Sequence, residues 1–353
     1  MSEKIELIGL SKEELTQQLK DLGEPAFRAK QIWQWIYYYG KTDFEEMTNL
    51  SKPLRQKLSE HFSLTRPQIV DEQISVDRTH KWLLQFADGQ RVEMVYIPEE
   101  DRGAVCISTQ VGCAMGCKFC HTGSQKLTRN LSAGEIVAQF MVARDAYNEW
   151  NLKEQARMLS NIVVMGMGEP FQNFENLKKA VNILSDGEGI AISKRRITVS
   201  TSGIVPHIAD FDQEIGTRLA ISLHAPNDEL RTQIMPINKK YPLTELMPAC
   251  HQYQQNHGGY ITFEYLMLQN FNDTYAHAQE LMQLMKKYQI NAKFNLIAFN
   301  PWPGCDFVPS SNNRIHAFSQ ELQKHGFAAP IRTARGQDIL AACGQLKSKK
   351  SAE

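Results

Sequence analysis

The sequence predicts an α/β protein: a partial (β/α) barrel with a small N-terminal helical domain and a connecting β-hairpin. Three observations indicate this fold. The first 65 residues contain several helix-start signals, and a β-hairpin pattern follows them. From about residue 103, apolar strands alternate with helical stretches. Strands joined by crossover helices form parallel βαβ units, which an α/β sheet or barrel requires.

Three short helices are expected in the N-terminal part. Ser11 and Glu14 form a capping box for a helix over residues 13–22. Pro25 is suited to the first turn of a second helix. Ser51 begins a third.

A β-hairpin is expected next, because HKWLLQF (80–86) and RVEMVYIP (91–98) flank the turn residues Asp88 and Gly89. The chain is therefore expected to divide into four parts. These are an accessory helical domain (1–65), a hairpin linker region (66–102), the barrel with a C-terminal segment (103–346) and a polar tail (347–353).

Six strands are expected in the barrel. They are VCIST (105–109), IVVMGM (162–167), RITVST (196–201), RLAISL (218–223), ITFEYLML (261–268) and KFNLIAF (293–299). Helices between them include one that opens at Ser132, where Glu135 completes a capping box, and one over residues 276–288. An open doubly wound sheet is the alternative. A partial barrel is favoured, because no GxGxxG motif follows the first strand and polar residues end many strands.

Composition is that of an ordinary globular protein. The 353 residues suffice for one large and one small domain, with 42% hydrophobic and 22% charged residues. Lys+Arg and Asp+Glu balance at 39 each, which argues mildly against a nucleic-acid partner, although a local basic patch remains compatible. The N-terminus lacks a signal-peptide pattern and no 18-residue apolar run occurs, so we expect a cytoplasmic protein without a membrane partner.

The strongest chemical signal is GCAMGCKFCHTG, which places Cys113, Cys117 and Cys120 at CxxxCxxC spacing after the first barrel strand. Such closely spaced thiolates suit an iron–sulfur cluster, whereas zinc usually has a second ligand pair, which does not follow here. Three ligands on a four-iron cluster leave one iron open. That iron can chelate the amino and carboxylate groups of S-adenosylmethionine (SAM).

With Phe119 before the last cysteine, this loop resembles that of the radical SAM superfamily, whose fold is a partial (β/α)6 barrel. The likeness narrows to the RlmN/Cfr family of RNA adenine-carbon methyltransferases. It extends from LGEPAFRAKQIW (22–33) through MGMGEP (165–170), STSG (200–203), SLHAPND (222–228), MPIN (235–238), AFNPWPG (298–304) and RGQDILAACGQL (335–346). The helical N-terminal segment resembles RlmN rather than Cfr.

The resemblance implies one [4Fe-4S] cluster, SAM, and a ping-pong methylation of adenine C2 that uses two SAM per turnover. The implied substrates are adenine 2503 of 23S rRNA and adenine 37 of tRNA, with an electron donor such as flavodoxin. We also expect a monomer, and RNA recognition by the N-terminal helices.

Three residues match the family's chemical roles. Cys343 corresponds to the cysteine that SAM methylates, Cys106 to the resolving cysteine that forms a transient disulfide with it, and Glu93 to the proton acceptor. Their local sequence patterns alone favour non-catalytic roles. The two cysteines would be inert buried thiols, and Glu93 would be a solvated carboxylate on a strand. For function we expect polar surroundings at Cys106, and aliphatic neighbours that raise the pKa of Glu93.

The SAM contacts implied by the family are Gly168, Glu169, Ser200, Ser222, Leu223, His224 and Asn300. Glycine would let the backbone approach the ligand, and the carboxylate would bind the SAM ammonium. Alone, the Gly-rich strand end is often a turn, and His224 is more often a satisfied buried histidine. The cysteines at 250 and 305 match no role and are expected to be structural.

Two basic runs, Lys194–Arg196 and Lys347 with Lys349 and Lys350, are either solvated faces or phosphate contacts. Two other functions stay open. One is methylation of adenine C8, as in Cfr. The other is a non-catalytic iron–sulfur protein with Cys106 as fourth ligand.

Overall fold

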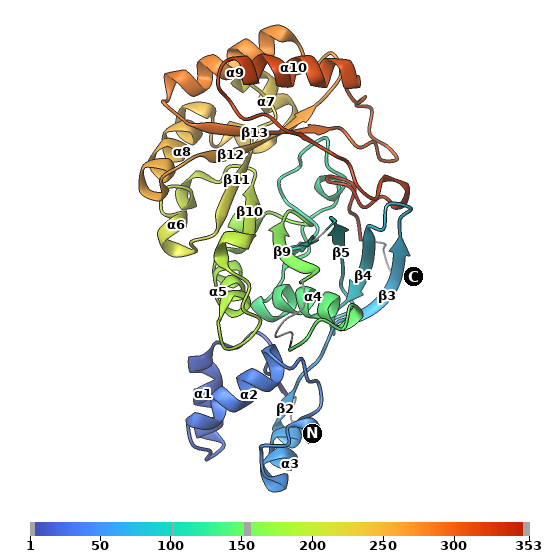
Figure 1. The fold of residues 1–353 in the computed structure, drawn as a ribbon, viewed down its shortest axis with the longest axis vertical. Helices are drawn as coiled ribbons and strands as arrows, with labels where there is room; N and C mark the ends of the chain where they lie inside the picture. The colour runs from blue at the N-terminus through green and yellow to red at the C-terminus, as the bar shows by residue number, and fades with distance from the viewer. Residues whose placement is uncertain (1–3, 101, 152–156, 349–353) are drawn as a thin grey trace.

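The computed structural model describes residues 4–100, 102–151 and 157–348. Figure 1 shows an elongated molecule with the N-terminal helices at one end and the last two long helices at the other. A large curved sheet lies between them. The N-terminal helices are α1 (Lys12–Asp21), α2 (Phe27–Tyr37) and α3 (Lys52–His61).

The predicted helix starts in this segment are confirmed with one shift. Ser11 and Glu14 form the capping box of α1, and Ser51 is the N-cap residue of α3. The second helix begins at Phe27, two residues after Pro25. Two short strands that the pattern did not predict, β1 (Ile5–Glu6) and β2 (Phe62–Ser63), pair in parallel and bring the segment's two ends together.

Close backbone packing joins this segment to the barrel. An added Cβ at Gly134 would lie 2.2 Å from the Ile8 carbonyl oxygen, so the two backbones are in direct contact there. Lys12 forms ion pairs with Asp186 (2.7 Å) and Glu188 (2.8 Å). The N-terminal helices are therefore fixed against the barrel.

Within the described residues the main sheet has ten strands in the order β14-β13-β12-β11-β10-β9-β6-β5-β4-β3. The strands are β3 (Gln68–Ile74), β4 (His80–Gln85), β5 (Arg91–Pro98), β6 (Gly103–Cys106), β9 (Leu159–Val164), β10 (Ile197–Thr201), β11 (Arg218–Ser222), β12 (Ile261–Met267), β13 (Ala292–Ala298) and β14 (Ile331–Arg332). Strands β6 and β9–β14 are parallel, whereas β3–β6 pair antiparallel. A separate small ladder joins β7 (Gln110–Val111) to β8 (Arg129–Asn130).

The six predicted parallel strands are confirmed, with ends that differ by at most three residues. Their spatial order follows their sequence order without a reversal, which excludes the doubly wound alternative. The hairpin turn is also confirmed, with Gly89 at a φ of +80°. Strands β3 and β14 were not predicted. Strand β3 makes the hairpin a three-stranded extension that continues the barrel sheet through β5 and β6, whereas β14 pairs with β13 at the opposite edge.

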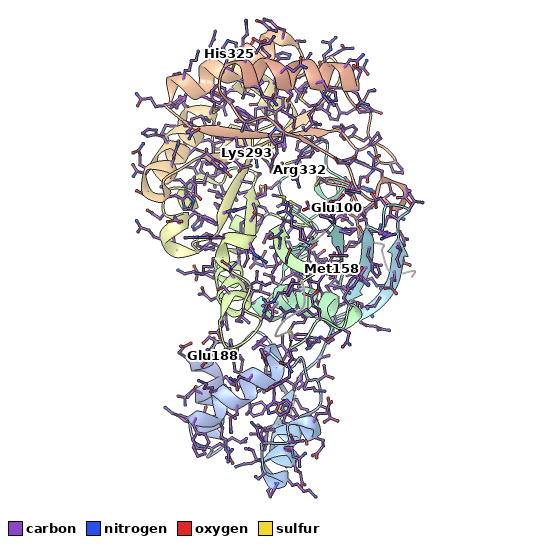
Figure 2. All side chains as sticks on the ribbon, in the orientation of Figure 1. Glu100, Met158, Glu188, Lys293, His325 and Arg332 are labelled. Carbon is purple, nitrogen blue, oxygen red and sulfur yellow. The ribbon has the colours of Figure 1, made fainter. Side chains whose placement is uncertain are left out.

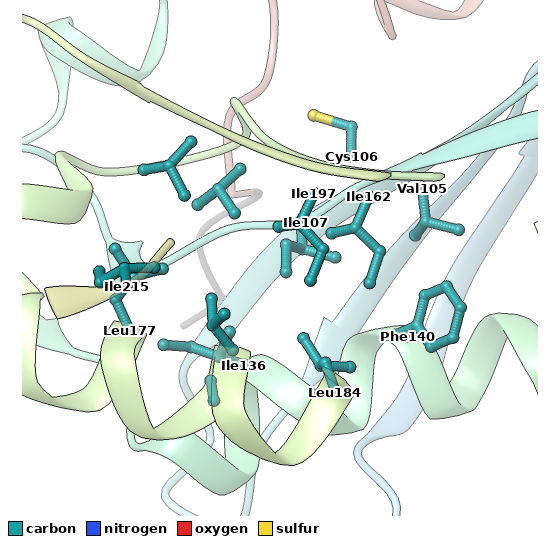
Figure 3. Packing of buried hydrophobic residues seen from close by; sticks show 14 of the residues in the cluster. Val105, Cys106, Ile107, Ile136, Phe140, Ile162, Leu177, Leu184, Ile197 and Ile215 are labelled. Atoms are coloured by element: carbon teal, nitrogen blue, oxygen red, sulfur yellow. The ribbon is translucent and has the colours of Figure 1, made fainter. Parts of the chain in front are cut away.

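Helices cover the outer face of the parallel strands. They are α4 (Ala133–Ala146), α5 (Phe174–Ser185), α6 (Phe211–Glu214), α7 (Asp228–Ile234), α8 (Leu243–His257), α9 (Tyr275–Lys287) and α10 (Asn312–Lys324). The expected capping box of α4 is present at Ser132 and Glu135. Figure 3 shows α4 and α5 packing their apolar side chains against the sheet, while the sulfur of Cys106 points away from this layer. The inner face is thus left for polar and reactive groups. In the described part of the chain no helix has the length and apolarity to cross a bilayer.

Candidate active site

The concave face of the sheet encloses a cavity of about 1250 Å³. Cys106, Cys343 and Asn300 line one part of it. The rest extends to the amino ends of the strands, where Arg218 and Lys293 line the wall. The family-matched cysteines 106 and 343, which are 237 positions apart, therefore share one chamber.

The cysteine loop lies between β7 and β8. Cys113, Cys117 and Cys120 are each partly buried, and electrostatic interactions between the thiols raise the pKa of Cys113 and Cys117 after the larger effect of desolvation. Glu169 also acts on Cys113 and Cys117, so it lies near the loop.

The donor set fits an iron–sulfur cluster. Backbone N–H groups point at two of the sulfurs, from Met115 to Cys113 and from Gly123 to Cys120, and such bonds favour thiolates. Among the residues that the structure describes, no three His, Cys, Asp or Glu side chains already surround an ion position. Each cysteine of a four-iron cluster binds a different iron, so the three sulfurs need not converge on one ion position.

The C-terminal segment holds the cysteine loop in place. The His121 amide donates to the Gly344 carbonyl (2.7 Å), and the Thr122 hydroxyl donates to the Leu346 carbonyl (2.6 Å). Cys343 lies next to this contact. Its side chain is exposed to the cavity, which is itself walled by the protein. Its pKa is raised by desolvation and then by Glu264, and Cys120 contributes in the same direction. Cys343 thus lies between the cysteine loop and the barrel wall.

Cys106 does not have the polar surroundings that we expected. Its side chain is buried within the main hydrophobic cluster, and desolvation strongly raises the pKa of the thiol, with Cys343 as the next contributor. A backbone bond from Met165 opposes the shift only weakly. That Cys343 acts on it places the two thiols close together. The resting Cys106 is therefore a protonated thiol beside Cys343.

Glu93 is buried, with 4% of its surface exposed. The expectation that its neighbours are aliphatic is wrong. Its carboxylate forms an ion pair with buried Lys81 (3.0 Å) and accepts the Lys347 amide (2.7 Å). The alternation of residues 91–98 could not reveal Lys81 as a partner, because Lys81 belongs to the neighbouring strand β4. In the described residues the cavity lining includes Leu346 but not Glu93.

Glu169 lies in the loop that follows β9 and is nearly inaccessible at 3% exposure. It accepts bonds from the Phe171 amide (3.0 Å), the Thr201 hydroxyl (2.7 Å) and the Ser202 amide (2.7 Å). Desolvation raises its pKa against these bonds. A carboxylate offers about four acceptor positions, so it can still receive an ammonium.

Packing against Gln110, and not only a ligand, requires glycine at position 168. Its φ is +100°, and a Cβ there would lie 2.5 Å from the Gln110 side chain. The Gln110 amide oxygen in turn accepts the Glu169 N–H (2.8 Å). The glycine thus permits the close contact that orients Glu169.

His224 is a satisfied buried histidine. Its Nδ1 accepts the Leu266 amide (3.0 Å), its own carbonyl accepts from Asn272 (2.7 Å), and Phe119 packs edge-on against the ring. Burial lowers the pKa of His224 to about 3, so the ring is neutral. Any ligand contact here would use the Ser222–His224 backbone or a neutral imidazole.

The remaining two expected SAM contacts lie at strand ends. Ser200 occupies β10 in register with Ala220 of β11. Asn300 follows β13, accepts from Gln337 (2.7 Å) and donates to the Cys343 carbonyl (3.4 Å). Asn300 therefore also positions the segment that carries Cys343.

Sequence inspection missed Arg231, whose side chain is fully buried. Its guanidinium donates to the carbonyls of Leu223 (3.2 Å), Ser202 (2.7 Å) and Ser222 (3.2 Å), and it acts on Cys117. A lone arginine on a short amphipathic helix carries no sequence signal of this role. It ties together the strand ends that hold the expected SAM contacts.

The first basic run divides into two roles. Lys194 is structural, because its ammonium donates to the Ile215 carbonyl (2.7 Å). Arg195 and Arg196 line the cavity instead. In the second run Lys349 and Lys350 lie outside the described residues. Of the two unassigned cysteines, Cys250 is buried in α8, and Cys305 is half-buried near the Lys118 carbonyl.

Comparison with known proteins matches the chain to two family models. Residues 5–64 match the ribosomal RNA large subunit methyltransferase N-terminal domain, and residues 107–285 match the radical SAM superfamily. The dual-specificity RNA methyltransferase RlmN of Gluconobacter oxydans is 56% identical over 98% of this chain and 85% of its own length. The protein of the same name from Rhodospirillum rubrum is 56% identical over 98% of this chain and 80% of its length.

A solved structure agrees over the whole chain. The crystal structure of a radical SAM methyltransferase from Sphaerobacter thermophilus is 44% identical and superimposes with a TM-score of 0.92, over 98% of this chain and 100% of that one. The predicted radical SAM fold is thus confirmed, and the chain belongs to the RlmN family of radical SAM methyltransferases.

Proposed function

We propose that this enzyme methylates C2 of an adenine in RNA through a methylated Cys343, with two SAM consumed per turnover. One observation carries the proposal: Cys343 and Cys106 face the same cavity beside the CxxxCxxC loop. Adenine C2 is electron-poor and does not attack a sulfonium methyl group directly. When bound, the [4Fe-4S] cluster and SAM supply the radical chemistry that removes this obstacle.

The chain's own residues then divide the remaining tasks. Cys113, Cys117 and Cys120 hold the cluster. Glu169 binds the SAM ammonium, while Gly168, Ser200, the 222–224 strand end and Asn300 complete the SAM pocket. Glu169 acts on Cys113 and Cys117, and Arg231, which binds the Ser202 and Ser222 carbonyls, acts on Cys117; these contacts support the assignment.

Cys343 carries the methyl-derived carbon into the cavity, where the base is held. The Cys106 thiolate attacks the sulfur of Cys343, so an S–S bond forms and the S–CH2 bond to the base breaks. The electron pair of the broken bond stays with the methylene carbon, which takes up a proton to become the methyl group, and a Cys106–Cys343 disulfide remains. Because Cys106 rests as a buried thiol, this attack requires loss of its proton within the closed site.

Glu93 accepts the ring proton in this scheme. In the described state its carboxylate is held by Lys81 and the Lys347 amide. Access to the base therefore requires the 346–348 segment to move, because this segment stands at the cavity wall.

Substrates and partners follow from the family. We propose 23S rRNA and tRNA as substrates, an electron donor such as flavodoxin, action as a monomer and a cytoplasmic location. The relatives' name, dual-specificity RNA methyltransferase, supports two RNA substrates. The match of residues 5–64 to a ribosomal RNA methyltransferase domain supports an RNA-binding role for the N-terminal helices.

Anaerobic reconstitution with iron, sulfide and SAM, followed by assay on 23S rRNA and tRNA, tests the proposal. We expect 2-methyladenosine by mass spectrometry against authentic 2-methyl and 8-methyl standards. Release of 5′-deoxyadenosine would exclude a non-catalytic cluster. An 8-methyl product would refute the C2 assignment, and zinc in the purified protein would refute the radical mechanism.

A further inference from the structure

A polar pair on the barrel wall has no role in the proposed chemistry. Glu264 of β12 and Asn295 of β13 are register partners, and both line the cavity. The Asn295 amide nitrogen donates to the Glu264 carboxylate (2.9 Å). Only 6% of the Glu264 surface is exposed. A carboxylate in a parallel strand is costly to bury, so its presence calls for a specific partner.

The hydrogen bond within this pair has a defined direction. Desolvation raises the pKa of Glu264, whereas the Asn295 hydrogen bond and the charges of Arg332 and Lys293 oppose that shift. Lys293 of β13 and Arg332 of β14, both labelled in Figure 2, also line the cavity. Because the Asn295 nitrogen donates to the Glu264 carboxyl group, the amide oxygen is directed elsewhere.

Among the described residues that oxygen has no hydrogen-bond partner, and it is buried. A buried acceptor without a donor costs about 1–3 kcal/mol, so a donor that reaches it is favoured. Asn295 and Glu264 both line the cavity, so a ligand that turns the amide toward the cavity would meet two acceptors side by side. Together they suit a group that donates two N–H bonds.

Cys343 lies next to these acceptors, because Glu264 is the second largest influence on the pKa of its thiol. A purine held with C2 at the Cys343 sulfur keeps its C6 substituent within one ring width, since only N1 separates C2 from C6. In adenine this substituent is an amino group with two N–H donors. In guanine and hypoxanthine it is a carbonyl oxygen, which two acceptors would repel.

We propose that Glu264 and Asn295 select adenine by accepting hydrogen bonds from its exocyclic amino group inside the barrel. This inference rests on the proposed function and adds the residues that determine base specificity. They contact the amino group on C6, which N1 separates from the reacting carbon C2. Replacing them should therefore change which base is accepted before it changes how the methyl group is transferred.

The test compares RNA oligonucleotides that carry adenosine, purine riboside (no 6-amino group) or inosine at the target position. The reconstituted wild-type enzyme should prefer adenosine to purine riboside by about tenfold or more in kcat/KM, the loss expected for two unmet acceptors. In Asn295→Leu, a near-isosteric change, this preference should fall to within about threefold. Affinity of the RNAs without SAM gives a second readout that needs no turnover.

Thr262→Val is the matched control, because Thr262 lines the same cavity on the same strand as Glu264. It should keep the wild-type preference. Comparing base preferences within each protein cancels the intrinsic reactivity of the analogues, and the wild-type arm is informative even where a variant folds poorly.

Equal use of adenosine and purine riboside by the wild type would overturn the inference. So would a Glu264→Gln variant that slows every RNA equally, since Glu264 would then act only on Cys343. Either result leaves the proposed function intact as long as adenosine RNA is methylated at C2. Absence of that product would instead refute the proposed function itself.

Discussion

At the scale of single residues, the two cavity thiols have different surroundings. Cys343 is exposed to the chamber, whereas Cys106 is buried at the cavity wall and the pKa of its thiol is raised by desolvation. Exposure suits a sulfur that must meet SAM and then RNA. Enclosure suits one that must stay unreactive until a partner sulfur arrives.

Changing Cys106 to Ala should therefore leave radical formation intact but block product release. We expect 5′-deoxyadenosine at near wild-type yield and a covalent protein–RNA adduct that accumulates, seen as a shifted band on denaturing gels. Cys250→Ala, a buried cysteine away from the cavity, is the control and should give free product. Normal yields of free methylated RNA from Cys106→Ala would contradict the resolving role.

Changing Cys343 to Ala should abolish methylation and the adduct together, because the carbon carrier is lost. The double variant Cys106→Ala/Cys343→Ala should likewise show no adduct. Intact-protein mass spectrometry should detect an added methyl group on the wild type and none on Cys343→Ala. A methyl group retained on Cys343→Ala would place the carrier at another residue.

His224 predicts a pH-dependent stability. Burial lowers its pKa to about 3 from 6.5, so protonation favours the unfolded chain and stability falls as the pH drops below 6.5 toward 3. Relative to His224→Asn, which keeps an acceptor for the Leu266 amide, the wild type should lose about 1.4 kcal/mol between pH 7.5 and pH 5.5. Urea unfolding at both values measures this.

His316→Asn, at an exposed position of α10, is the control and should show no comparable change. A constant difference between the wild type and His224→Asn across this range would show that the ring is not neutral in the folded protein.

Among the helices and strands, local sequence signals predicted those with a clear capping or hydrophobic pattern. They missed the strands that form only because neighbouring strands pair with them. The capping boxes at Ser11 and Ser132 and the six parallel strands were predictable, because each signal lies within one segment. Strand β14 has two residues, and β3 is mostly solvent-facing, so neither shows a usable hydrophobic pattern.

The same distinction explains the site. The CxxxCxxC loop is a local motif, so the sequence alone reveals it. The Lys81–Glu93 pair and the Glu264–Asn295 pair join side chains from adjacent strands, which no single-segment pattern reveals. One usable signal existed: a charged residue inside the apolar strand ITFEYLML marks an inward position that needs a partner.

The junction between the N-terminal helices and α4 gives an element-level prediction. Gly134→Ala would ordinarily stabilise a helix by about 1 kcal/mol. Here the added methyl would lie 2.2 Å from the Ile8 carbonyl oxygen, so we expect a net loss of about 1–3 kcal/mol in urea unfolding. Gly187→Ala is the control, because a Cβ there meets nothing within 4 Å. Unchanged stability of Gly134→Ala would mean that this contact is absent in solution.

At the scale of the whole molecule, a net charge of zero conceals an uneven distribution. Arginines gather at the cavity, from several elements that are distant in sequence. They are Arg102, Arg157, Arg195, Arg196, Arg218, Arg332 and Arg335, against the lining carboxylates Glu99 and Glu264. An RNA strand whose base enters this cavity brings its phosphates to the same rim. Balanced composition was therefore a weak argument against RNA, because recognition depends on local charge.

This distribution predicts how RNA affinity depends on salt. Each phosphate contact contributes about 0.7–0.9 to the slope of log K against log salt concentration. Arg195→Ala and Arg218→Ala should each weaken binding to rRNA and tRNA fragments by similar factors and reduce this slope by about that amount. Lys324→Ala is the matched control, since its side chain is 71% exposed on α10, away from the cavity. An unchanged slope in both arginine variants would indicate that RNA approaches by another face, with the N-terminal helices as the next surface to test by deletion of residues 1–65.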